Sequence, residues 1–231
     1  MKVSIIIPCY NEKDTILEIL KKIENVKLDK IQKEIIIIDD CSTDGTGEIL
    51  KNLFYSLKVQ VIFHDKNLGK GAAVRAGLKH VTGDIVIIQD ADLECDPVDY
   101  PQLLKPILDG KADVVYGSRF TVSQPHRVWF FRHYLANKIL TLFSNVLTNL
   151  NLSDMETCYK AFKSSIISSI SLKENGFGFE CEFTMKIAKK RYRIYEVGIS
   201  YYGRHYSEGK KIKWKDGLWT LWCLIKYKIL D

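Results

Sequence analysis

Short apolar runs alternate with amphipathic stretches through the first half of the chain. Five such runs, rich in Ile and Val, lie at residues 3–8, 34–38, 58–63, 84–89 and 112–116. Apolar runs of this length are typical of strands that are buried on both faces of a parallel sheet. The stretches between them predict helices over residues 13–26, 46–57 and 97–108, and a further helix that opens within 67–72 and runs to about 81. This alternation predicts an α/β protein with a doubly wound, mostly parallel sheet and flanking helices.

The pattern changes after Gly117. Residues 127–149 predict a long helix that is apolar on more than one face, so it is expected to be buried, at a partner interface or on a membrane. Further along, the sequence predicts a loop entering a strand at 154–162, a helix at 177–189 and a strand at 193–201. Residues 214–230 predict an amphipathic helix with flanking lysines, which suits an anionic lipid surface or docking on the domain's own core.

Composition changes this interpretation little. The 231 residues are 46% hydrophobic and 27% charged, as expected for one globular domain. The net charge of +6 is uneven, because Lys and Arg gather in residues 186–228 while acidic residues cluster at 39–48 and 90–99. This asymmetry suits an acidic ligand or an anionic surface.

The six cysteines are dispersed, with no paired spacing. They predict free thiols in a reducing compartment, here the cytoplasm, and no zinc site is expected. No stretch reaches the ~18 consecutive apolar residues expected of a membrane span. Any membrane contact is therefore expected to be peripheral.

The strongest candidate chemistry is the pair Asp90 and Asp92, which ends the fourth apolar run. Ligands of open α/β sheets lie in the crevice beyond the carboxyl ends of such strands. Two carboxylates one residue apart at that edge can share a divalent cation with a ligand's phosphates, as is common for Mg²⁺. The alternative is an acidic turn or a helix cap near Pro97.

Other polar residues follow the first three predicted strands. Tyr10 and Glu12 follow the first, where the Tyr10 ring suits either stacking on a nucleobase or core packing. Of Asp39 and Asp40, one suits a hydrogen bond to a ribose or a base, and the other a turn. Two glycines beside Lys70 open the next helix and suggest backbone amides available to an anion, although a flexible turn explains them equally.

Three candidates lie in the second half. Asp154 is expected near the crevice if its strand returns to the sheet. Glu180 and Glu182 open a predicted helix, where they suit either catalysis or stabilisation of the helix N-terminus. The Gly-bearing basic loop 204–211 could close over a phosphate, or it could be an ordinary solvated loop.

Seven motifs stand in a characteristic order: Pro8-Cys-Tyr-Asn-Glu12, Asp39-Asp40-Cys-Ser-Thr-Asp44-Gly-Thr46, Asn67-Leu-Gly-Lys-Gly71, Asp90-Ala-Asp-Leu-Glu94, Gly117-Ser-Arg-Phe120, Asp154-Met-Glu-Thr157 and the loop from Arg204 to Lys211. Together they cover nearly the whole chain. In this order they resemble glycosyltransferase family 2 with a GT-A fold. The closest likeness is to the branch of dolichyl- and polyprenyl-phosphate hexose synthases.

The resemblance implies roles for individual residues. Nucleotide-sugar contacts are implied for Pro8, Tyr10, Glu12, Asp39, Asp40, Lys70 and Asp90. A Mg²⁺ or Mn²⁺ site is implied for Asp90, Asp92 and Glu94. Acceptor-phosphate contacts are implied for Arg119, Arg132, Arg204, Lys210 and Lys211. The catalytic residues are then expected to be Asp92, Arg119 and Asp154.

The resemblance also implies an activity, namely metal-dependent, inverting transfer of a hexose from a UDP- or GDP-sugar to a polyprenyl or dolichyl phosphate. Such an acceptor is already mostly anionic and needs no general base. A glycan hydroxyl acceptor would need one, for which Asp154, Glu180 and Glu182 are the candidates. A non-catalytic sugar-nucleotide-binding module is a further alternative. Nucleic acid is not expected as a partner, because the acidic strand ends repel phosphate in the absence of a metal.

These expectations set the organisation of the chain. A GT-A domain is expected over residues 1–213, with a nucleotide-binding half at about 1–118 and an acceptor half at about 119–213. The amphipathic helix would occupy 214–231. We expect peripheral contact with an anionic membrane surface at its cytoplasmic face, or with a membrane-protein partner. The 127–149 helix also offers a surface for a homodimer.

Overall fold

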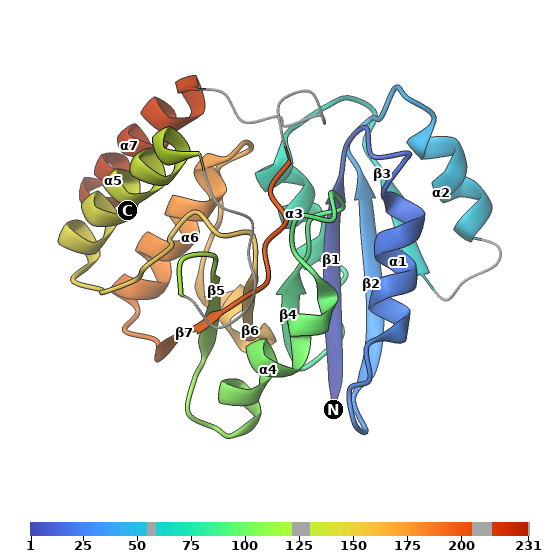
Figure 1. The fold of residues 1–231 in the computed structure, drawn as a ribbon, viewed down its shortest axis with the longest axis horizontal. Coiled ribbons are helices and arrows are strands. Elements are labelled where there is room, and N and C mark those ends of the chain that lie inside the picture. The colour runs from blue at the N-terminus through green and yellow to red at the C-terminus, as the bar shows by residue number, and fades with distance from the viewer. Residues whose placement is uncertain (55–58, 122–129, 205–213, 231) are drawn as a thin grey trace.

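The computed structural model describes residues 1–54, 59–121, 130–204 and 214–230 (Figure 1). The strands are β1 (Lys2–Cys9), β2 (Gln32–Asp39), β3 (Val59–Phe63), β4 (Ile85–Ile88), β5 (Val114–Ser118), β6 (Lys160–Lys163) and β7 (Ile194–Gly198). The α-helices are α1 (Ile16–Asn25), α2 (Thr46–Phe54), α3 (Lys70–Leu78), α4 (Tyr100–Leu108), α5 (Phe131–Thr148), α6 (Gly178–Lys189) and α7 (Trp214–Ile229). Two 3₁₀ helices, η1 (Pro97–Asp99) and η2 (Ser164–Ser169), complete the described elements.

The seven strands form one sheet in the order β3-β2-β1-β4-β6-β5-β7. Only β6 is antiparallel to its neighbours, β4 and β5, so the prediction of a mostly parallel sheet is confirmed. Each face of the sheet carries its own hydrophobic core. Ile5 and Ile7 of β1 pack in the core formed with α1 and α4, whereas Ile6 packs in the core formed with α3 and α6. Burial on both faces explains why these strands are continuous apolar runs.

Some boundaries differ from the predicted ones. The first helix begins at Ile16 rather than Lys13, because the carbonyl of Glu12 accepts the amides of Thr15 and Ile16 in a preceding turn. The fourth predicted helix begins as the 3₁₀ turn η1, with the Asp96 side chain accepting the amide of Val98. The 3₁₀ helix η2 was not predicted. These differences shift element ends and leave the order of elements unchanged.

The helices α5 and α7 pack against each other and against α6 (Figure 1). The buried residues of α5 are the small polar Thr141 and Ser144, and those of α7 are Thr220, Cys223, Leu224 and Tyr227. Most of the larger apolar side chains of both helices face outward, so of the alternatives left open for residues 127–149 the structure does not support complete burial. Nine exposed apolar residues of the two helices retain 43–73% of their accessible surface: Phe131, Leu135, Ile139, Leu142, Val146, Leu218, Trp222, Ile225 and Ile229. Among the described helices, none is both long enough and apolar enough to cross a bilayer.

A buried carboxylate fastens α7 to the domain. Glu174, just before α6, accepts hydrogen bonds from Trp219 Nε1 (3.1 Å), Lys226 Nζ (2.7 Å) and the Tyr227 hydroxyl (2.8 Å). Since a single side chain bonds residues that lie two turns apart on α7, the orientation of that helix is fixed. The outward apolar side chains of α7 are therefore a defined feature of the fold.

A second carboxylate makes the fold sensitive to acid. Glu34 of β2 accepts hydrogen bonds from Lys2 Nζ, Ser4 and Thr82. Burial alone would raise its pKa, but these bonds lower the pKa of Glu34 from 4.5 to about 2. A lowered pKa contributes stability that is present above pH 4.5 and is lost as the pH falls toward 2.

We therefore expect Glu34→Gln to unfold more easily than the wild type at pH 7. The difference in unfolding free energy should shrink steadily as the pH falls from 5 to 2, because the wild-type carboxylate takes up a proton over that range. Urea denaturation of both proteins along this pH series measures the difference. A difference that stays constant with pH would contradict the assignment.

Candidate active site

A pocket of about 600 Å³ lies beyond the carboxyl ends of β1, β2, β4 and β5. It is lined by residues from both halves of the chain, including α5 and α7. Its titratable lining is strongly acidic, with Glu12, Asp40, Asp90, Asp92, Glu94, Glu156, Glu180 and Asp216 against Lys70, Arg119 and Arg204. An anionic ligand would therefore need an accompanying cation to bind here.

The acidic turn after β4 is held from beneath by Gln89. This buried side chain donates from Nε2 to the carbonyls of Asp90 (2.9 Å) and Cys95 (3.2 Å). Its Oε1 accepts the hydroxyls of Tyr100 (2.8 Å) and Tyr159 (2.6 Å). Because Gln89, Tyr100 and Tyr159 are buried in the core, the turn has a fixed position at the edge of the sheet.

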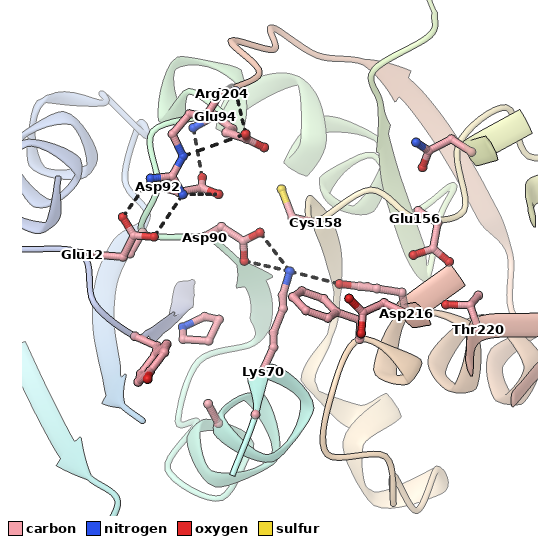
Figure 2. A pocket seen from close by; sticks show the side chains of 18 of the residues that line it. Glu12, Lys70, Asp90, Asp92, Glu94, Glu156, Cys158, Arg204, Asp216 and Thr220 are labelled. Carbon is pink, nitrogen blue, oxygen red and sulfur yellow. Dashed lines mark hydrogen bonds and ion pairs between the residues drawn. The ribbon is translucent and has the colours of Figure 1, made fainter. Parts of the chain in front are cut away.

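Two positively charged side chains, Lys70 and Arg204, lie among the carboxylates at the centre of the pocket (Figure 2). Lys70 Nζ lies 2.9 Å from Asp90 and 3.2 Å from Glu180. Arg204 lies 3.1 Å from Glu12 and 3.4 Å from Asp92. The site therefore carries its own partial charge compensation when no ligand is bound.

Asp92 has the most perturbed carboxyl of this acidic turn. Burial and the charges of Asp90 and Glu94 raise the pKa of Asp92 to about 7, although Arg204 opposes the rise. A carboxylate destabilised by like charges is one that a divalent cation would stabilise.

The predicted metal ligands do not all point to one common coordination site. Glu94 accepts hydrogen bonds from the Tyr201 hydroxyl and the Arg204 amide, while Asp90 pairs with Lys70. Among the described residues, no three His, Cys, Asp or Glu side chains converge as metal ligands. Asp92 nevertheless fits a Mg²⁺ or Mn²⁺ ion that keeps open positions for ligand phosphates, since Mg²⁺ commonly uses one or two protein carboxylates.

The residues predicted at the nucleotide end are mostly brought together. Pro8, Tyr10, Glu12, Asp40 and Lys70 line the pocket, whereas Asp39 is 4% exposed and does not. Neighbouring residues of a strand point to opposite faces of the sheet, so one of two consecutive aspartates is turned away.

Asp40 holds the loop before α3. Its carboxylate accepts the amides of Leu68 (2.9 Å) and Gly69 (2.7 Å) and pairs with the His64 ring (2.7 Å). Gly69 has a φ of +94°, and a Cβ there would lie 2.6 Å from the carbonyl oxygen of Asn175. The Gly69 amide, which was predicted to be available to an anion, is thus bonded to Asp40, and this contact positions the loop that carries Lys70.

Only some of the residues predicted to bind the acceptor phosphate line the pocket. Arg119 lines the pocket, and its guanidinium bonds both oxygens of Asp154 at 2.7 and 2.8 Å. Asp154 is fully buried and does not line the pocket, so its contacts favour a positioning role. Arg132 is exposed on α5, outside the pocket lining. Lys210 and Lys211 lie outside the described residues.

The two glutamates of α6 are ion-paired. Glu180 contacts the buried Lys160 as well as Lys70. Glu182 accepts the backbone amides of residues 173 and 174 and pairs with Lys186 at 2.9 Å. These contacts give Glu182 a structural role.

Sequence analysis missed the opposite end of the pocket, where Glu156, Asp216 and Thr220 lie (Figure 2). Glu156 stands two residues after Asp154 in a motif that drew attention only to the aspartate. Asp216 and Thr220 belong to a helix that was expected to follow the domain. The small and polar residues on one side of that helix could have indicated that it packs closely on the site.

The sequence model described as Glycosyl transferase family 2 matches residues 4–171. The dolichol-phosphate mannosyltransferase of Pyrococcus furiosus is 30% identical over 212 residues, which are 91% of this chain and 59% of that protein. The undecaprenyl-phosphate 4-deoxy-4-formamido-L-arabinose transferase of Edwardsiella ictaluri is 33% identical over 172 residues, 73% of this chain and 51% of that protein. The chain thus spans between half and three fifths of the length of these two curated relatives.

Among solved structures, the chain resembles glucosyl-3-phosphoglycerate synthase from Mycobacterium tuberculosis in complex with Mn²⁺, UDP and phosphoglyceric acid. The TM-score is 0.75 and the identity 21%, with 100% of this chain and 79% of that chain covered. At this identity the likeness concerns the fold, and it confirms the predicted GT-A architecture.

Proposed function

The chain belongs to glycosyl transferase family 2, and from that premise we propose that it is a metal-dependent, inverting glycosyltransferase. The donor would be a UDP- or GDP-sugar, and the acceptor a polyprenyl or dolichyl phosphate. One observation carries the proposal: a single pocket joins the acidic turn after β4 to Arg119 and Arg204. The acidic turn suits a cation bound against a diphosphate, and arginine suits the oxygens of a second phosphate.

In the proposed reaction, an oxygen of the acceptor phosphate attacks the anomeric carbon of the donor sugar. The bond from that carbon to the diphosphate breaks, the nucleoside diphosphate leaves with the electron pair, and the configuration inverts. A divalent cation held at Asp92 would supply positive charge that stabilises the departing diphosphate. Since a phosphate monoester is mostly ionised at neutral pH, no side chain has to remove a proton.

The two arginines would act differently. Arg119 is fixed by its paired contacts with Asp154, so its guanidinium is oriented before the acceptor arrives. Arg204 instead pairs with Glu12 and Asp92 within the pocket. Once the charge of the acidic turn is neutralised, Arg204 would exchange Asp92 for a ligand phosphate.

Two observations support a phosphate rather than a hydroxyl acceptor. The candidate bases are engaged in ion pairs, Asp154 with Arg119, Glu180 with Lys160 and Glu182 with Lys186. The names of the two relatives reported above, a dolichol-phosphate mannosyltransferase and an undecaprenyl-phosphate 4-deoxy-4-formamido-L-arabinose transferase, both include a polyprenyl-type phosphate.

An acceptor competition tests this proposal. The protein is incubated with Mn²⁺, labelled UDP-glucose or GDP-mannose, and equal amounts of a short polyprenyl phosphate, the corresponding polyprenol and an alkyl glycoside. We expect label in the polyprenyl phosphate alone. Label in the polyprenol or the glycoside would identify a hydroxyl-directed enzyme instead. Donor binding with no labelled product would identify a non-catalytic module.

A lipid acceptor gives the outer faces of α5 and α7 a role. The two helices carry Arg132, Lys138, Lys215, Lys226 and Lys228 against the single acidic residue Asp216. Both also contribute residues to the pocket lining, so their exposed apolar side chains adjoin the proposed acceptor site. Apolar side chains with a basic surround suit the interface of an anionic membrane. We propose that this face rests on such a membrane.

The double variant Leu142→Glu/Trp222→Glu tests the membrane contact. It should bind phosphatidylcholine vesicles containing phosphatidylserine about tenfold more weakly than the wild type, because two exposed apolar side chains become anionic. Vesicle cosedimentation measures the binding. A matched control is Leu17→Glu, which changes a 51% exposed leucine on α1, far from α5 and α7 in Figure 1.

Two results would contradict the membrane contact. One is equal vesicle binding by the double variant and the wild type. The other is a wild-type dimer in sedimentation that the double variant dissociates, which would assign the face to a second copy of the chain.

A further inference from the structure

Glu156 is the carboxylate of the pocket with the least explained environment. It lies between α5 and β6 and lines the end of the pocket opposite Glu12 and Arg204, with Lys70 and Asp90 between them (Figure 2). Its Oε1 is buried, and among the described residues no group forms a hydrogen bond with that atom.

Oε1 of Glu180 also lacks a hydrogen bond, but it lies 3.2 Å from Lys70 Nζ, and the central carboxylates are ion-paired as well. Asp90 pairs with Lys70, and Glu12 and Asp92 pair with Arg204. Buried polar atoms of native proteins are nearly always hydrogen-bonded, and each exception calls for an explanation, such as a functional role or a bound water or ion. A buried oxygen that faces a ligand pocket is stabilised when a ligand donates a hydrogen bond to it.

The charges around Glu156 limit which ligand group it accepts. Burial and the neighbouring Glu180, with a smaller effect of Asp154, raise the pKa of Glu156 to about 7, although Lys160 and Arg119 oppose the rise. Near neutral pH the carboxyl therefore exists both with and without its proton. In either form it bonds a hydroxyl, as donor or as acceptor, whereas its ionised form repels a phosphate.

The position of Glu156 agrees with a sugar rather than the nucleotide. In the proposed function, on which this inference rests, the base and ribose lie near Tyr10 and Glu12, and the diphosphate lies at Asp92. The transferred sugar then follows the diphosphate toward the opposite end of the pocket. Glu156 lines that end, beside Asp216 and Thr220 of α7.

We propose that Glu156 is a specificity-determining residue whose carboxyl forms a hydrogen bond with a hydroxyl of the transferred sugar. It would contribute to the binding of the nucleotide-sugar and not to the binding of the nucleoside diphosphate alone. The hydroxyl that it contacts would be one that the enzyme requires in its donor.

Calorimetry with the wild type, Glu156→Ala and Glu156→Gln tests this role in the presence of Mn²⁺. The ligands are UDP, GDP, UDP-glucose, GDP-mannose, and analogues of the bound donor that each lack one sugar hydroxyl. We expect Glu156→Ala to bind the donor about tenfold more weakly and the nucleoside diphosphate within twofold of the wild type. Glu156→Gln, whose amide still forms hydrogen bonds, should retain most of the affinity.

The deoxy analogues identify the contact. One of them should bind the wild type about tenfold more weakly than the full donor, and Glu156→Ala should bind that analogue and the full donor equally. Asp109→Asn, which alters a carboxylate paired with Lys105 on the surface, should behave as the wild type throughout.

The results that would contradict the role of Glu156 can be distinguished from those that would contradict the proposed function. Equal donor affinity in the wild type and Glu156→Ala would overturn the role of Glu156 while leaving the proposed function intact. Unchanged donor affinity with loss of turnover on a hydroxyl acceptor alone would overturn it by making Glu156 a base. If the wild type binds neither nucleoside diphosphate, the proposed function fails, and the inference fails with it.

Discussion

Replacing Asp92 by asparagine is expected to lower the rate of sugar transfer about 10³-fold, which corresponds to a barrier increase of about 4 kcal/mol. The substitution keeps the size of the side chain and removes the charge that would hold a cation against the diphosphate. Without that cation, the acidic lining of the pocket opposes the binding of an anionic donor. Initial rates with saturating polyprenyl phosphate measure the loss.

The same substitution should not weaken the fold. Since the pKa of Asp92 is raised to about 7, ionisation of this carboxyl destabilises the folded protein. The destabilisation is complete once the pH exceeds 7. Asp92→Asn is therefore expected to unfold at the same or a higher temperature than the wild type at pH 8. A variant that retains more than a third of the wild-type rate would contradict the assignment of Asp92. A clear drop in melting temperature would contradict the account of its environment.

The second large effect is expected from Asp154→Asn, which should lower the free energy of unfolding by about 3–5 kcal/mol. Arg119 and Asp154 form a buried pair with side-chain exposures of 10% and 0%. Burial lowers the pKa of Arg119, but the Asp154 carboxylate more than offsets this and holds it well above its ordinary value. Removing the Asp154 charge leaves the buried guanidinium without the carboxylate that bonds two of its nitrogens.

The structure provides a matched control at the surface. Asp113 also pairs with an arginine, Arg193, but the exposures there are 18% and 53%. Asp113→Asn should cost no more than about 1 kcal/mol. Urea denaturation of both variants gives the comparison. If Asp154→Asn is as stable as the wild type and is inactive only toward hydroxyl acceptors, Asp154 is a base and not a positioning residue.

The strands and their order along the chain were predictable because burial on both faces produces continuous apolar runs. The location of the site followed from the same pattern, since parallel strands place their carboxyl ends at one edge of the sheet. For this reason Tyr10, Glu12, Asp40, Asp90 and Asp92 were all correctly expected in one crevice.

Side-chain partners were harder to predict, because they depend on contacts between segments far apart in the sequence. No local pattern shows that Arg204 lies beside Glu12, or that Asp154 binds Arg119 within the protein. The outward apolar faces of α5 and α7 were also ambiguous. Close packing of α5 uses the small residues Thr141 and Ser144, so its larger apolar side chains are left outside.

Metal-dependent binding of a nucleotide-sugar in the pocket can be measured with a thermal-shift panel. UDP, GDP, UDP-glucose and GDP-mannose are each measured with Mn²⁺ and again with a chelator, in the wild type and in Asp92→Asn. We expect one nucleotide to raise the melting temperature only with Mn²⁺, and Asp92→Asn to lose this shift. No shift with any of the four, or an equal shift in the presence of chelator, would contradict this expectation.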